Sequence, residues 1–459
     1  MSGQAAFLLL LLPAVLAALL SGMNAFVAIG GVSILVALLA SAAGSFDLAL
    51  LNAVPARLAG ILENTVLTAV PLFVAMGALL DRSGVASAMI TALTRTASGS
   101  ARKLSLSILV MSAILAAATG VVGATIVMLA TIALPGLLAA GMSKSRAAGL
   151  VCASGTLGQI IPPSVLLLLL SDQVSNAWLQ SQRQSGNFAA DPVTASDLFA
   201  AAFMPGLMLA MLYALWVVTN PAFAKARARA GENAPPSPVT TVGPSLLLPV
   251  LLPSALATMV LGSILLGIAT PTEASSIGAC GALLLAMFRG TRPLPATIRV
   301  AATDTIRLTG AIFAIVIAAS LLSLVFRGLD GDRLIENLVS QLPGGQAGAL
   351  ALVMLAIFVL GFFLEFVEII FIVVPVAAPA LFATGIDPVW FAVLVAMNLQ
   401  TSFLTPPFGL SLFYFRSAAP QVSTVEIWRG VAPYVLLQLV GLALVAAFPA
   451  LATWLPGLL

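Results

Sequence analysis

Long apolar runs separated by short polar segments dominate this sequence. The runs lie at roughly 7–20, 25–43, 64–80, 104–140, 147–170, 198–218, 246–268, 274–288, 308–326, 346–384, 389–415 and 430–448. Several are too long for one membrane span of ~20 residues and too short for two, which is typical of re-entrant hairpins and broken helices. The pattern predicts an all-α polytopic membrane protein, and the composition of 61% hydrophobic and 8% charged residues agrees with it.

One Pro and Gly pattern occurs twice in the chain, at an offset of 244 positions. Its members are Pro135 with Pro379, Gly141 with Gly385, and Pro162-Pro163 with Pro406-Pro407. Gly84 and Gly328 keep the same offset further upstream. Matching irregular segments in two halves of a membrane protein are typical of secondary transporters built from inverted repeats. We therefore expect a duplicated fold with two irregular segments at membrane depth.

A polar, basic and Pro-rich segment at 222–245 separates the two halves. Because it carries Lys225, Arg227 and Arg229, we expect a cytoplasmic linker. Each half then contains one hairpin and one broken helix: in the first half, 1–221, at about 104–140 and about 147–170, and in the second half, 246–459, at about 346–384 and about 389–415. A further polar insert, Asp172 to Asp197, has no counterpart in the second half, and we place it outside.

The positions of Lys and Arg predict inverted topology. Basic residues flank both ends of the first hairpin segment, namely Arg95, Arg102, Lys103, Lys144 and Arg146. Both ends are therefore expected in the cytoplasm, with the tip at the Gly-containing stretch 118–123. Neither Lys nor Arg flanks 346–384, so this hairpin is expected to enter from outside, with its tip at 363–368. The helices after the Pro-Pro pairs agree, because Asp172 is then outside and Arg416 inside.

Unwound backbone is expected around both Pro-Pro pairs. In the stretch 154–164, glycines loosen the helix and the two prolines remove backbone donors. The freed carbonyl groups need partners at membrane depth, and Na⁺ is a suitable one. The matching stretch 398–409 adds side-chain oxygens from Asn398, Gln400, Thr401, Ser402 and Thr405. Two matching breaks favour ion or substrate binding over the alternative, two Pro-kinked helices whose hydroxyls bond their own backbone.

Two acidic residues, Glu365 and Glu368, lie in the second hairpin. An ionisable residue at membrane depth indicates a functional site by default. Their counterparts in the first half are Val121 and Ala124, so the repeat itself does not require an acid. Two interpretations stay open: a role in an ion site, and exposure at the interface or a hydrogen bond to a helix end.

Three other polar motifs have structural interpretations. Thr270 and Glu273 form a Thr-x-x-Glu helix-start pattern with a proline at the first helical position. Asp304 and Arg307 are spaced to pair with each other on one helix. The basic segment 289–299 is typical of a cytoplasmic loop followed by a short interfacial helix.

Several classes of function are excluded by what the sequence lacks. There is no histidine, so histidine-based metal sites, general-base catalysis and proton relays are absent. Motifs for nucleotide binding, zinc hydrolysis and serine hydrolysis are also absent, so the chain cannot by itself drive transport with ATP, and we expect it not to be an enzyme. The net charge of +3 comes mainly from short loops and does not indicate nucleic-acid binding.

Several separated motifs carry a family resemblance. They are AVPLFVAMGALLDRSGVA (69–86), GVVGATIVMLATIALPGLLAAGMS (120–143), SGTLGQIIPPS (154–164), GIATPTEASSIGA (267–279) and the region 362–409 with FFLEFVEI and NLQTSFLTPPFG. Together they resemble the large permease subunit of tripartite ATP-independent periplasmic (TRAP) transporters, over essentially the whole chain. The forms GTLGQIIPPS and FFLEFVEI, with the polar insert, are most similar to the mannitol and chloroaromatic branch.

The resemblance implies a bacterial inner-membrane protein that imports an organic acid, commonly a carboxylate, with a Na⁺ gradient. A periplasmic binding protein would deliver the substrate, and a separate small membrane subunit with four helices would complete the permease. The family's elevator-type arrangement implies that 104–170 and 346–415 move as a transport domain against a scaffold of the remaining helices. Sodium is then the only metal expected, and no organic cofactor is implied.

The resemblance also implies the site residues. The first sodium region would comprise Thr119, Gly120, Gly123, Ser154, Gly155, Thr156 and Pro162. The second would comprise Glu365, Glu368, Asn398, Gln400, Thr401, Thr405 and Pro406. The substrate would meet Thr119, Ser154, Thr156, Asn398, Thr401 and Ser402.

Three alternatives to this reading differ in what they need. A proton-coupled or exchange permease of the same fold needs a titratable group, which Glu365 offers. A membrane enzyme needs a cluster of catalytic groups, and only Glu365 and Glu368 approach one. A passive channel would work without the binding protein and would not concentrate its substrate.

Overall fold

A computed structural model describes residues 3–96, 100–119, 122–224, 248–289 and 293–458. Every regular element among these residues is a helix. Ten of the described helices are long and apolar enough to cross a membrane. The predicted linker lies, apart from residues 222–224, outside the described residues, as does Gly120 at the first hairpin tip.

The helices of the first half lead from the N-terminus to the linker. They are α1 (Gly3–Leu20), α2 (Ala25–Ala42), η1 (Leu48–Ala53), α3 (Val54–Glu63), α4 (Thr65–Arg82), α5 (Val85–Thr96), α6 (Ala101–Thr119), α7 (Val122–Ala139), α8 (Lys144–Thr156), η2 (Leu157–Gln159), α9 (Val165–Gln184), α10 (Ala195–Thr219) and α11 (Pro221–Ala224). The short connections at 120–121 and 140–143 make α6, α7 and α8 neighbours in the chain.

The second half repeats this order, with one long helix, α14, at the place of η1, α3 and α4. Its elements are α12 (Leu248–Leu265), α13 (Pro271–Arg289), α14 (Leu294–Gly328), α15 (Gly331–Gln341), α16 (Gly345–Leu360), α17 (Phe366–Ala383), α18 (Pro388–Leu404), α19 (Leu410–Ala418), α20 (Thr424–Ala447), α21 (Ala450–Thr453) and η4 (Pro456–Leu458).

The helix bounds keep the offset of 244 positions found in the sequence. Helices α6 and α16 begin at 101 and 345, α7 and α17 at 122 and 366, and α8 and α18 at 144 and 388. Both α7 and α17 also end at equivalent positions, 139 and 383. Both Pro-Pro peptide bonds are cis. Each half therefore contains a helical hairpin followed by a helix that breaks at the Pro-Pro pair.

The two breaks form where the prolines were expected to cause them. Helix α8 ends at Thr156, and α9 begins at Val165 after the η2 turn. The Ser164 hydroxyl donates to the Gln159 carbonyl oxygen over 2.8 Å, which satisfies one acceptor within the break. Helix α18 ends at Leu404, and α19 begins at Leu410.

Three structural expectations need correction. Helix α9 does not end near Asp172 but continues to Gln184, since helix-forming residues reach as far as Gly186, which has φ +81°. The basic segment 289–299 is not followed by a short interfacial helix, because α14 is one continuous helix of 35 residues. Asp304 pairs with Arg82 of α4 at 2.7 Å rather than with Arg307, because α4 and α14 pack together.

The Thr-x-x-Glu motif caps a helix as expected. The Thr270 amide and hydroxyl both donate to Glu273 Oε2, over 2.8 and 2.9 Å, and the Glu273 amide donates back to the Thr270 hydroxyl. The motif therefore begins α13 as a capping box.

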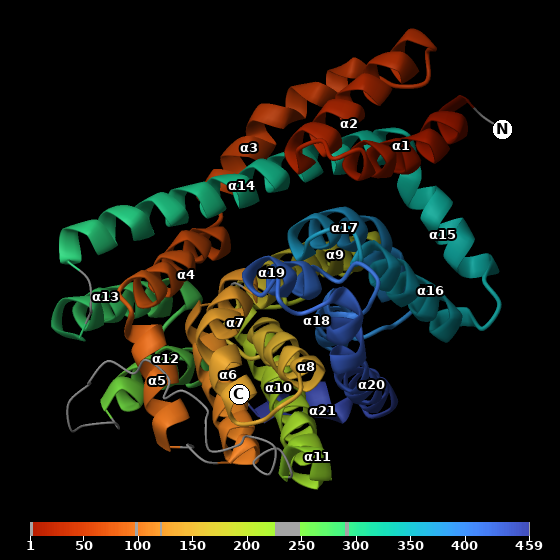
Figure 1. Cartoon of the computed structure of the whole chain (residues 1–459). Helices are drawn as coiled ribbons and strands as arrows, with labels where there is room; N and C mark the ends of the chain where they lie inside the picture. The colour runs from red at the N-terminus through yellow and green to blue at the C-terminus, as the bar shows by residue number, and fades with distance from the viewer. Residues whose placement is uncertain (1–2, 97–99, 120–121, 225–247, 290–292, 459) are drawn as a thin grey trace.

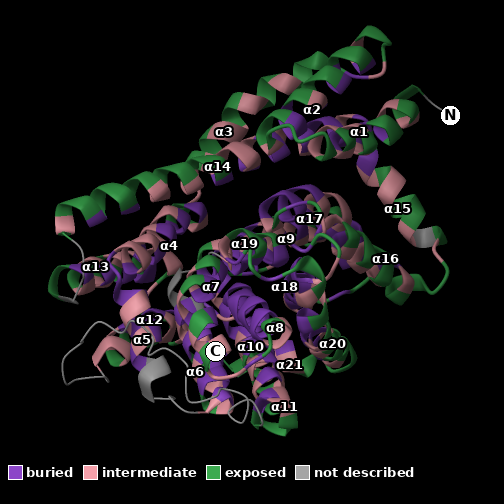
Figure 2. Cartoon of the chain, in the orientation of Figure 1, coloured by how far each residue is buried: buried purple, intermediate pink, exposed green. Residues whose placement is uncertain are grey.

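The hairpins and broken helices form an inner bundle, which we define as α6–α9 with α16–α19. Figure 1 shows α14 passing across one side of this bundle, with α2 and α3 on its far side and α4 and α13 beneath one half of it. Buried residues concentrate in the bundle, whereas α3 and α14 carry many exposed ones (Figure 2). Leu8, Ile29 and Leu322, from α1, α2 and α14, form a separate hydrophobic cluster. We call α1–α4, α13 and α14 the outer layer.

Contacts between distant segments place the ends of the two hairpins on opposite sides. Lys144, at the base of the first hairpin, donates to the Gln421 carbonyl oxygen at 2.9 Å, and Arg146 donates to that of Ala222 at 3.3 Å. The first hairpin base, the start of the linker and the end of α19 therefore share one side. At the other end, the Trp178 ring of α9 meets Phe382 at the base of the second hairpin, with centroids 6.0 Å apart.

The crossing of α8 and α20 yields the first testable prediction. A Cβ at Gly149 would lie 1.9 Å from the Gly430 carbonyl oxygen. We expect Gly149→Ala to lower the stability of the protein in detergent by about 1–3 kcal/mol, because the helices have to separate. Thermal unfolding followed by tryptophan fluorescence measures this. Gly262→Ala in α12 is the matched control, since no atom lies within 4 Å of its added Cβ. Equal melting temperatures for the two variants would contradict the prediction.

Candidate functional site

Both hairpins and both helix breaks meet at one small cavity of about 150 Å³. The first half contributes Val122 and Gly123 at the start of α7, Gln159 in the break and Val165 at the start of α9. The second half contributes Glu365, Phe366 and Val367 at the start of α17, Phe403 at the end of α18, and Leu410, Ser411 and Tyr414 on α19. Helix α14 closes the cavity with Leu308, Ala311, Ile312 and Ile315.

Four helices begin at this cavity. Residues in the first turn of α7, α9, α17 and α19 all line it. The first backbone N–H groups of a helix have no partner within the helix, and the aligned peptide dipoles give this end a partial positive charge. Four such ends around one space favour an anionic ligand there.

The polar side chains in and beside the cavity come mainly from the second half. The Tyr414 hydroxyl donates to Glu365 Oε1 over 3.0 Å, and Glu365 is the residue immediately before α17. Glu368 follows in the first turn of α17 and is buried. Glu368 Oε2, Gln159 Oε1 and Ser411 Oγ have no hydrogen-bond partner among the described residues. These buried oxygens suit a hard cation, which takes oxygen ligands.

Glycines allow each hairpin to lie against a broken helix. A Cβ at Gly123 would lie 2.9 Å from Tyr414 Cζ, so the bare backbone of α7 receives the Tyr414 ring. At Gly155 of α8 the added atom would lie 2.3 Å from Ile126 Cγ1. At the turn of the second hairpin, Gly361 likewise permits a close contact with α18, because a Cβ there would lie 2.0 Å from Ser402 Oγ.

The cavity adjoins two further hollows on the side of the first hairpin base. One shares Gly123 and Tyr414 with the cavity and follows α7 as far as Thr131 and Ile132. The other shares Leu308 and Ala311 of α14 with the cavity. Both are lined by Arg82, and the second is also lined by its ion-pair partner Asp304. Space therefore continues from the cavity toward the end of the molecule that carries Lys144.

The residues of the first predicted sodium region lie in the inner bundle. Ser154, Gly155, Thr156 and Pro162 are buried, and Ser154 Oγ has no partner within the described chain. Gly123 lines the cavity. The side chain of Thr119, in the last turn of α6, lies outside what the structure describes, as does Gly120.

Thr156 meets residues of the other half instead of the first hairpin. The side-chain amides of Gln400 and Gln438 each donate to its hydroxyl oxygen over 3.5 Å, and the hydroxyl donates to the Ala153 carbonyl oxygen. Thr156 and Gln400 are equivalent positions of the two repeats. A contact between equivalents lies at the pseudo-two-fold axis, so the structure joins two residues that we had assigned to separate sodium regions.

In the second region, Asn398 reaches the second hairpin, because its side-chain amide donates to the Met354 carbonyl oxygen at 2.6 Å. The hydroxyls of Thr401, Ser402 and Thr405 donate to carbonyl oxygens of their own helix. These three bonds match the alternative interpretation of the break, a Pro-kinked helix whose hydroxyls bond their own backbone. Pro406 is partly exposed in the break. Of the second region, Glu365 is the member that lines the cavity.

Three cavity residues were missed from the sequence: Gln159, Ser411 and Tyr414. Gln159 precedes the first Pro-Pro pair by three positions, and Ser411 and Tyr414 follow the second pair. Position beside a break was the available signal, but the predicted site included only Ser154 and Thr156 as side-chain oxygens before the first pair, and no residue after the second pair.

Comparison with known proteins identifies the family. Residues 10–451 match the family described as tripartite ATP-independent periplasmic transporter, DctM component. The chain belongs to this family. The family works with a small membrane subunit and a periplasmic binding protein and transports small organic acids. The chain is thus a multi-pass transporter of the bacterial inner membrane and not an enzyme.

Curated relatives are TRAP large permeases with differing substrates in their names. The C4-dicarboxylate permease protein DctM of Rhodobacter capsulatus is 29% identical over 410 residues, which cover 87% of this chain and 88% of that protein. DctM of Vibrio cholerae is 27% identical, with 86% of each chain covered. The sialic acid permease protein SiaM of Vibrio cholerae is 26% identical, with 89% of this chain and 90% of that protein covered.

Two solved transporter structures share the fold at low sequence identity. The YdaH transporter of Alcanivorax borkumensis has a TM-score of 0.56 and 14% identity, with 88% of each chain covered. MtrF of Neisseria gonorrhoeae has a TM-score of 0.55 and 12% identity, covering 87% of this chain and 83% of that one. At such identities the likeness concerns the fold alone, and it agrees with the all-α polytopic prediction.

The contact of Gly123 with Tyr414 yields the second testable prediction. We expect Gly123→Ala to displace the Tyr414 ring and break its hydrogen bond to Glu365, lowering the rate of substrate uptake about tenfold, the equivalent of one charged hydrogen bond. Gly136→Ala on the same helix is the control, because its added Cβ would make an ordinary 3.8 Å contact with Leu104. Uptake into proteoliposomes is compared at equal amounts of folded protein. Similar rates for both variants would show that the ring position does not matter.

Proposed function

We propose that the chain is the large permease subunit of a sodium-coupled importer for an organic acid, which a periplasmic binding protein delivers. The observation that carries this proposal is the meeting of four helix N-termini, two hairpins and two helix breaks at one cavity. A substrate carboxylate is the ligand that such a set of N–H groups favours. Gln159, Ser411 and Tyr414 would orient it through their polar atoms.

The acidic residues of the second hairpin give a physical reason for cation coupling. Glu365 lines the cavity, and Glu368 is buried one turn further along α17. A carboxylate substrate would meet negative charge there, and in a site of low dielectric that repulsion is large. Sodium bound at the unpartnered oxygens would supply the positive charge that removes it. Ion and substrate would then bind tightly only together, which is a thermodynamic coupling between the two sites.

We further propose that the inner bundle moves as one unit against the outer layer, in an elevator-type cycle. Support comes from the close contacts at Gly155 and Gly361, which hold each hairpin against a broken helix. Helices α1 and α2 and part of α14 share a second hydrophobic cluster around Leu8, Ile29 and Leu322, which Ile372 of α17 also joins. The groups that line the cavity come from α7, α9, α17 and α19. These four helices must therefore move together if the site is to stay intact during transport.

The substrate is proposed at the level of a small organic acid. Relatives named for C4-dicarboxylates and sialic acid both belong to the family, so the shared cavity is not tied to one acid. The sequence resemblance to the mannitol and chloroaromatic branch stays a prediction. Aromatic acids and small oxo or hydroxy acids belong in the same test panel.

Glu368 favours one alternative, a proton-coupled or exchange permease of the same fold. It is buried at 8% exposure, and its Oε2 has no partner in the described part of the chain. Such a carboxyl group can carry a proton across the membrane. A sodium gradient and a pH gradient applied separately distinguish the two forms of coupling.

The third testable prediction is the uptake experiment itself. Proteoliposomes contain this chain with a small four-helix TRAP subunit, and the purified binding protein is added outside with labelled carboxylates. We expect accumulation only when an inward Na⁺ gradient and the binding protein are both present. Accumulation driven by a pH gradient or by an internal acid would support the alternative, and transport without the binding protein would indicate a different class of permease.

The fourth testable prediction concerns the proposed sodium regions. We expect Thr156→Val and Thr401→Val each to raise the Na⁺ concentration for half-maximal uptake about tenfold, since loss of one oxygen ligand of about 1.4 kcal/mol has this effect. Thr219→Val is the control, because its hydroxyl also donates to its own helix, at Leu215, but is exposed. If both site variants kept the sodium dependence of the unmodified protein, the assignment of these two regions would fail.

A further inference from the structure

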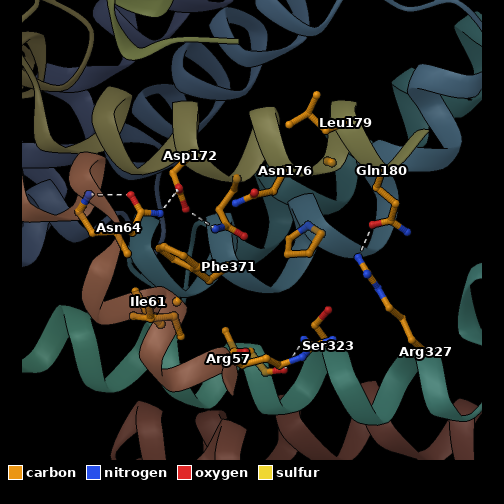
Figure 3. A pocket seen from close by; sticks show the side chains of 18 of the residues that line it. Arg57, Ile61, Asn64, Asp172, Asn176, Leu179, Gln180, Ser323, Arg327 and Phe371 are labelled. Carbon is orange, nitrogen blue, oxygen red and sulfur yellow. Dashed lines mark hydrogen bonds between the residues drawn. The ribbon is translucent and has the colours of Figure 1, made fainter. Parts of the chain in front are cut away.

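A second, larger hollow of about 580 Å³ separates the inner bundle from the outer layer. Figure 3 shows Arg57, Ser323 and Arg327 of α3 and α14 on one side of it, and Asp172, Asn176 and Gln180 of α9 on the other. It lies toward the end of α9 that carries the polar insert, and the charge pattern predicts that this end is outside. The small cavity and this hollow therefore open toward opposite ends of the molecule.

Positive charge faces the hollow from the outer layer. One guanidinium nitrogen of Arg57 donates to the Ser320 carbonyl oxygen at 3.3 Å, and no carboxylate lies within 4.0 Å of Arg57 among the described residues. Arg327 donates to Gln180 Oε1 and lies 4.0 Å from Asp332. Burial and the nearby charge of Arg327 both lower the pKa of the Arg57 guanidinium from its usual value. Two like charges held at one hollow favour an anion between them.

The carboxylate of Asp172, on the bundle side of the hollow, already has two hydrogen-bond partners. Asp172 Oδ1 accepts from the Asn64 side-chain amide at 2.7 Å, and Oδ2 accepts from that of Gln173 at 2.8 Å. Asp172 therefore faces amide groups instead of the arginines (Figure 3). The guanidinium of Arg57 keeps donors free for a ligand.

The same three helices pass from the small cavity to the large hollow in the same order. Helix α14 lines the cavity at Ile312 and the hollow at Ser323, and α9 lines them at Val165 and Asn176. Both of these pairs are eleven residues apart, or about 16 Å at a helical rise of ~1.5 Å per residue, and on α14 the two linings adjoin at Ile315 and Val316. Helix α17 follows with Val367 at the cavity and Pro375 at the hollow. A slide of the bundle along α14 by this distance would bring the cavity residues opposite Ser323.

We propose that Arg57 and Arg327 form the outer-layer wall of the substrate site in the outward-facing state, where they bind the substrate carboxylate. The inference rests on the proposed function, namely import of an organic acid by a moving bundle. The bundle carries Gln159, Ser411 and Tyr414 with it, whereas the wall supplied by the outer layer changes. In the outward position this wall is cationic. In the present position it consists of Leu308, Ala311, Ile312 and Ile315.

The change of wall makes the affinity for the substrate differ between the two positions, while the gradients of ion and substrate set the direction of net transport. A guanidinium offers a carboxylate two parallel charge-assisted hydrogen bonds, which an apolar wall cannot replace. The substrate is therefore held tightly when it arrives from outside and weakly after the slide. The hydrogen bond from Arg327 to Gln180 would be lost in the outward position, because Gln180 belongs to the moving bundle, whereas the 4.0 Å contact with Asp332 of α15 would remain.

Cross-linking tests the geometry without any substrate. In a chain with Cys152 and Cys280 replaced, Ser323→Cys is paired with Ser411→Cys and treated with Hg²⁺ in membranes. We expect this pair to cross-link in part of the molecules, namely those in which the bundle occupies the outward position. Ile312→Cys with Ser411→Cys is the control pair, because both positions line the present cavity. If the control pair forms and the test pair never does, the proposed slide is wrong.

Transport measurements test the role of the Arg57 and Arg327 charges. They use the labelled acid that the protein accumulates in the uptake experiment described above. We expect Arg57→Gln and Arg327→Gln to raise the concentration of loaded binding protein for half-maximal uptake about tenfold. The half-saturating acid concentration on the cytoplasmic side should stay unchanged, and Arg57→Lys should recover only part of the loss, because an ammonium group keeps the charge but cannot make the two parallel hydrogen bonds. Arg333→Gln is the control, since that side chain is 79% exposed. Unchanged uptake in both variants overturns the inference while leaving the proposed function intact, whereas an unmodified protein without sodium-driven uptake overturns the proposed function.

Discussion

Backbone groups left unpaired inside a membrane constrain this fold more than any other factor. An N–H or C=O group without a partner in hydrocarbon costs several kcal/mol, so a helix can break there only where protein or a lined cavity receives the freed groups. The chain breaks α8 from α9 and α18 from α19, and it turns back at two hairpin tips. Described residues of both hairpins, and residues in or beside both breaks, line one cavity. The site exists at this point because it is the place where the fold can tolerate interrupted helices.

The local parts of this arrangement could be predicted from the sequence. Proline removes a donor wherever it stands, so Pro162-Pro163 and Pro406-Pro407 indicate breaks without knowledge of the neighbours. The repeat offset then relates the hairpins, because α7 and α17 begin at equivalent positions. What could not be predicted depends on how the halves meet. Tyr414 lies against Gly123, and Asp304 finds Arg82 at 2.7 Å, only because distant helices pack together.

Thr156 shows the same limit for the sodium regions. Its place before the first break suggested a ligand facing the first hairpin. One sequence does not show where the pseudo-two-fold axis passes, and the structure places Thr156 on it, against its own repeat mate Gln400. Glu365 was expected at the tip of the second hairpin, and it lies there and lines the cavity. Its position depends mainly on its place within one hairpin, which the sequence shows.

The length of uncharged surface on α14 adds a condition to any movement along it. Residues 308–326 contain no ionisable side chain, and at a rise of ~1.5 Å per residue they span about 28 Å, close to the ~30 Å of a hydrocarbon core. Charged residues stand at both ends, with Arg307 before this stretch and Arg327 after it. A cavity that carries Glu365 and a substrate carboxylate past such a surface is costly to move unless its net charge is near zero. In the proposed cycle, a bundle that holds the substrate without a cation therefore carries net negative charge and moves slowly past this surface. The apolar middle of α14 would thus add to the coupling between cation and substrate that binding in the cavity establishes.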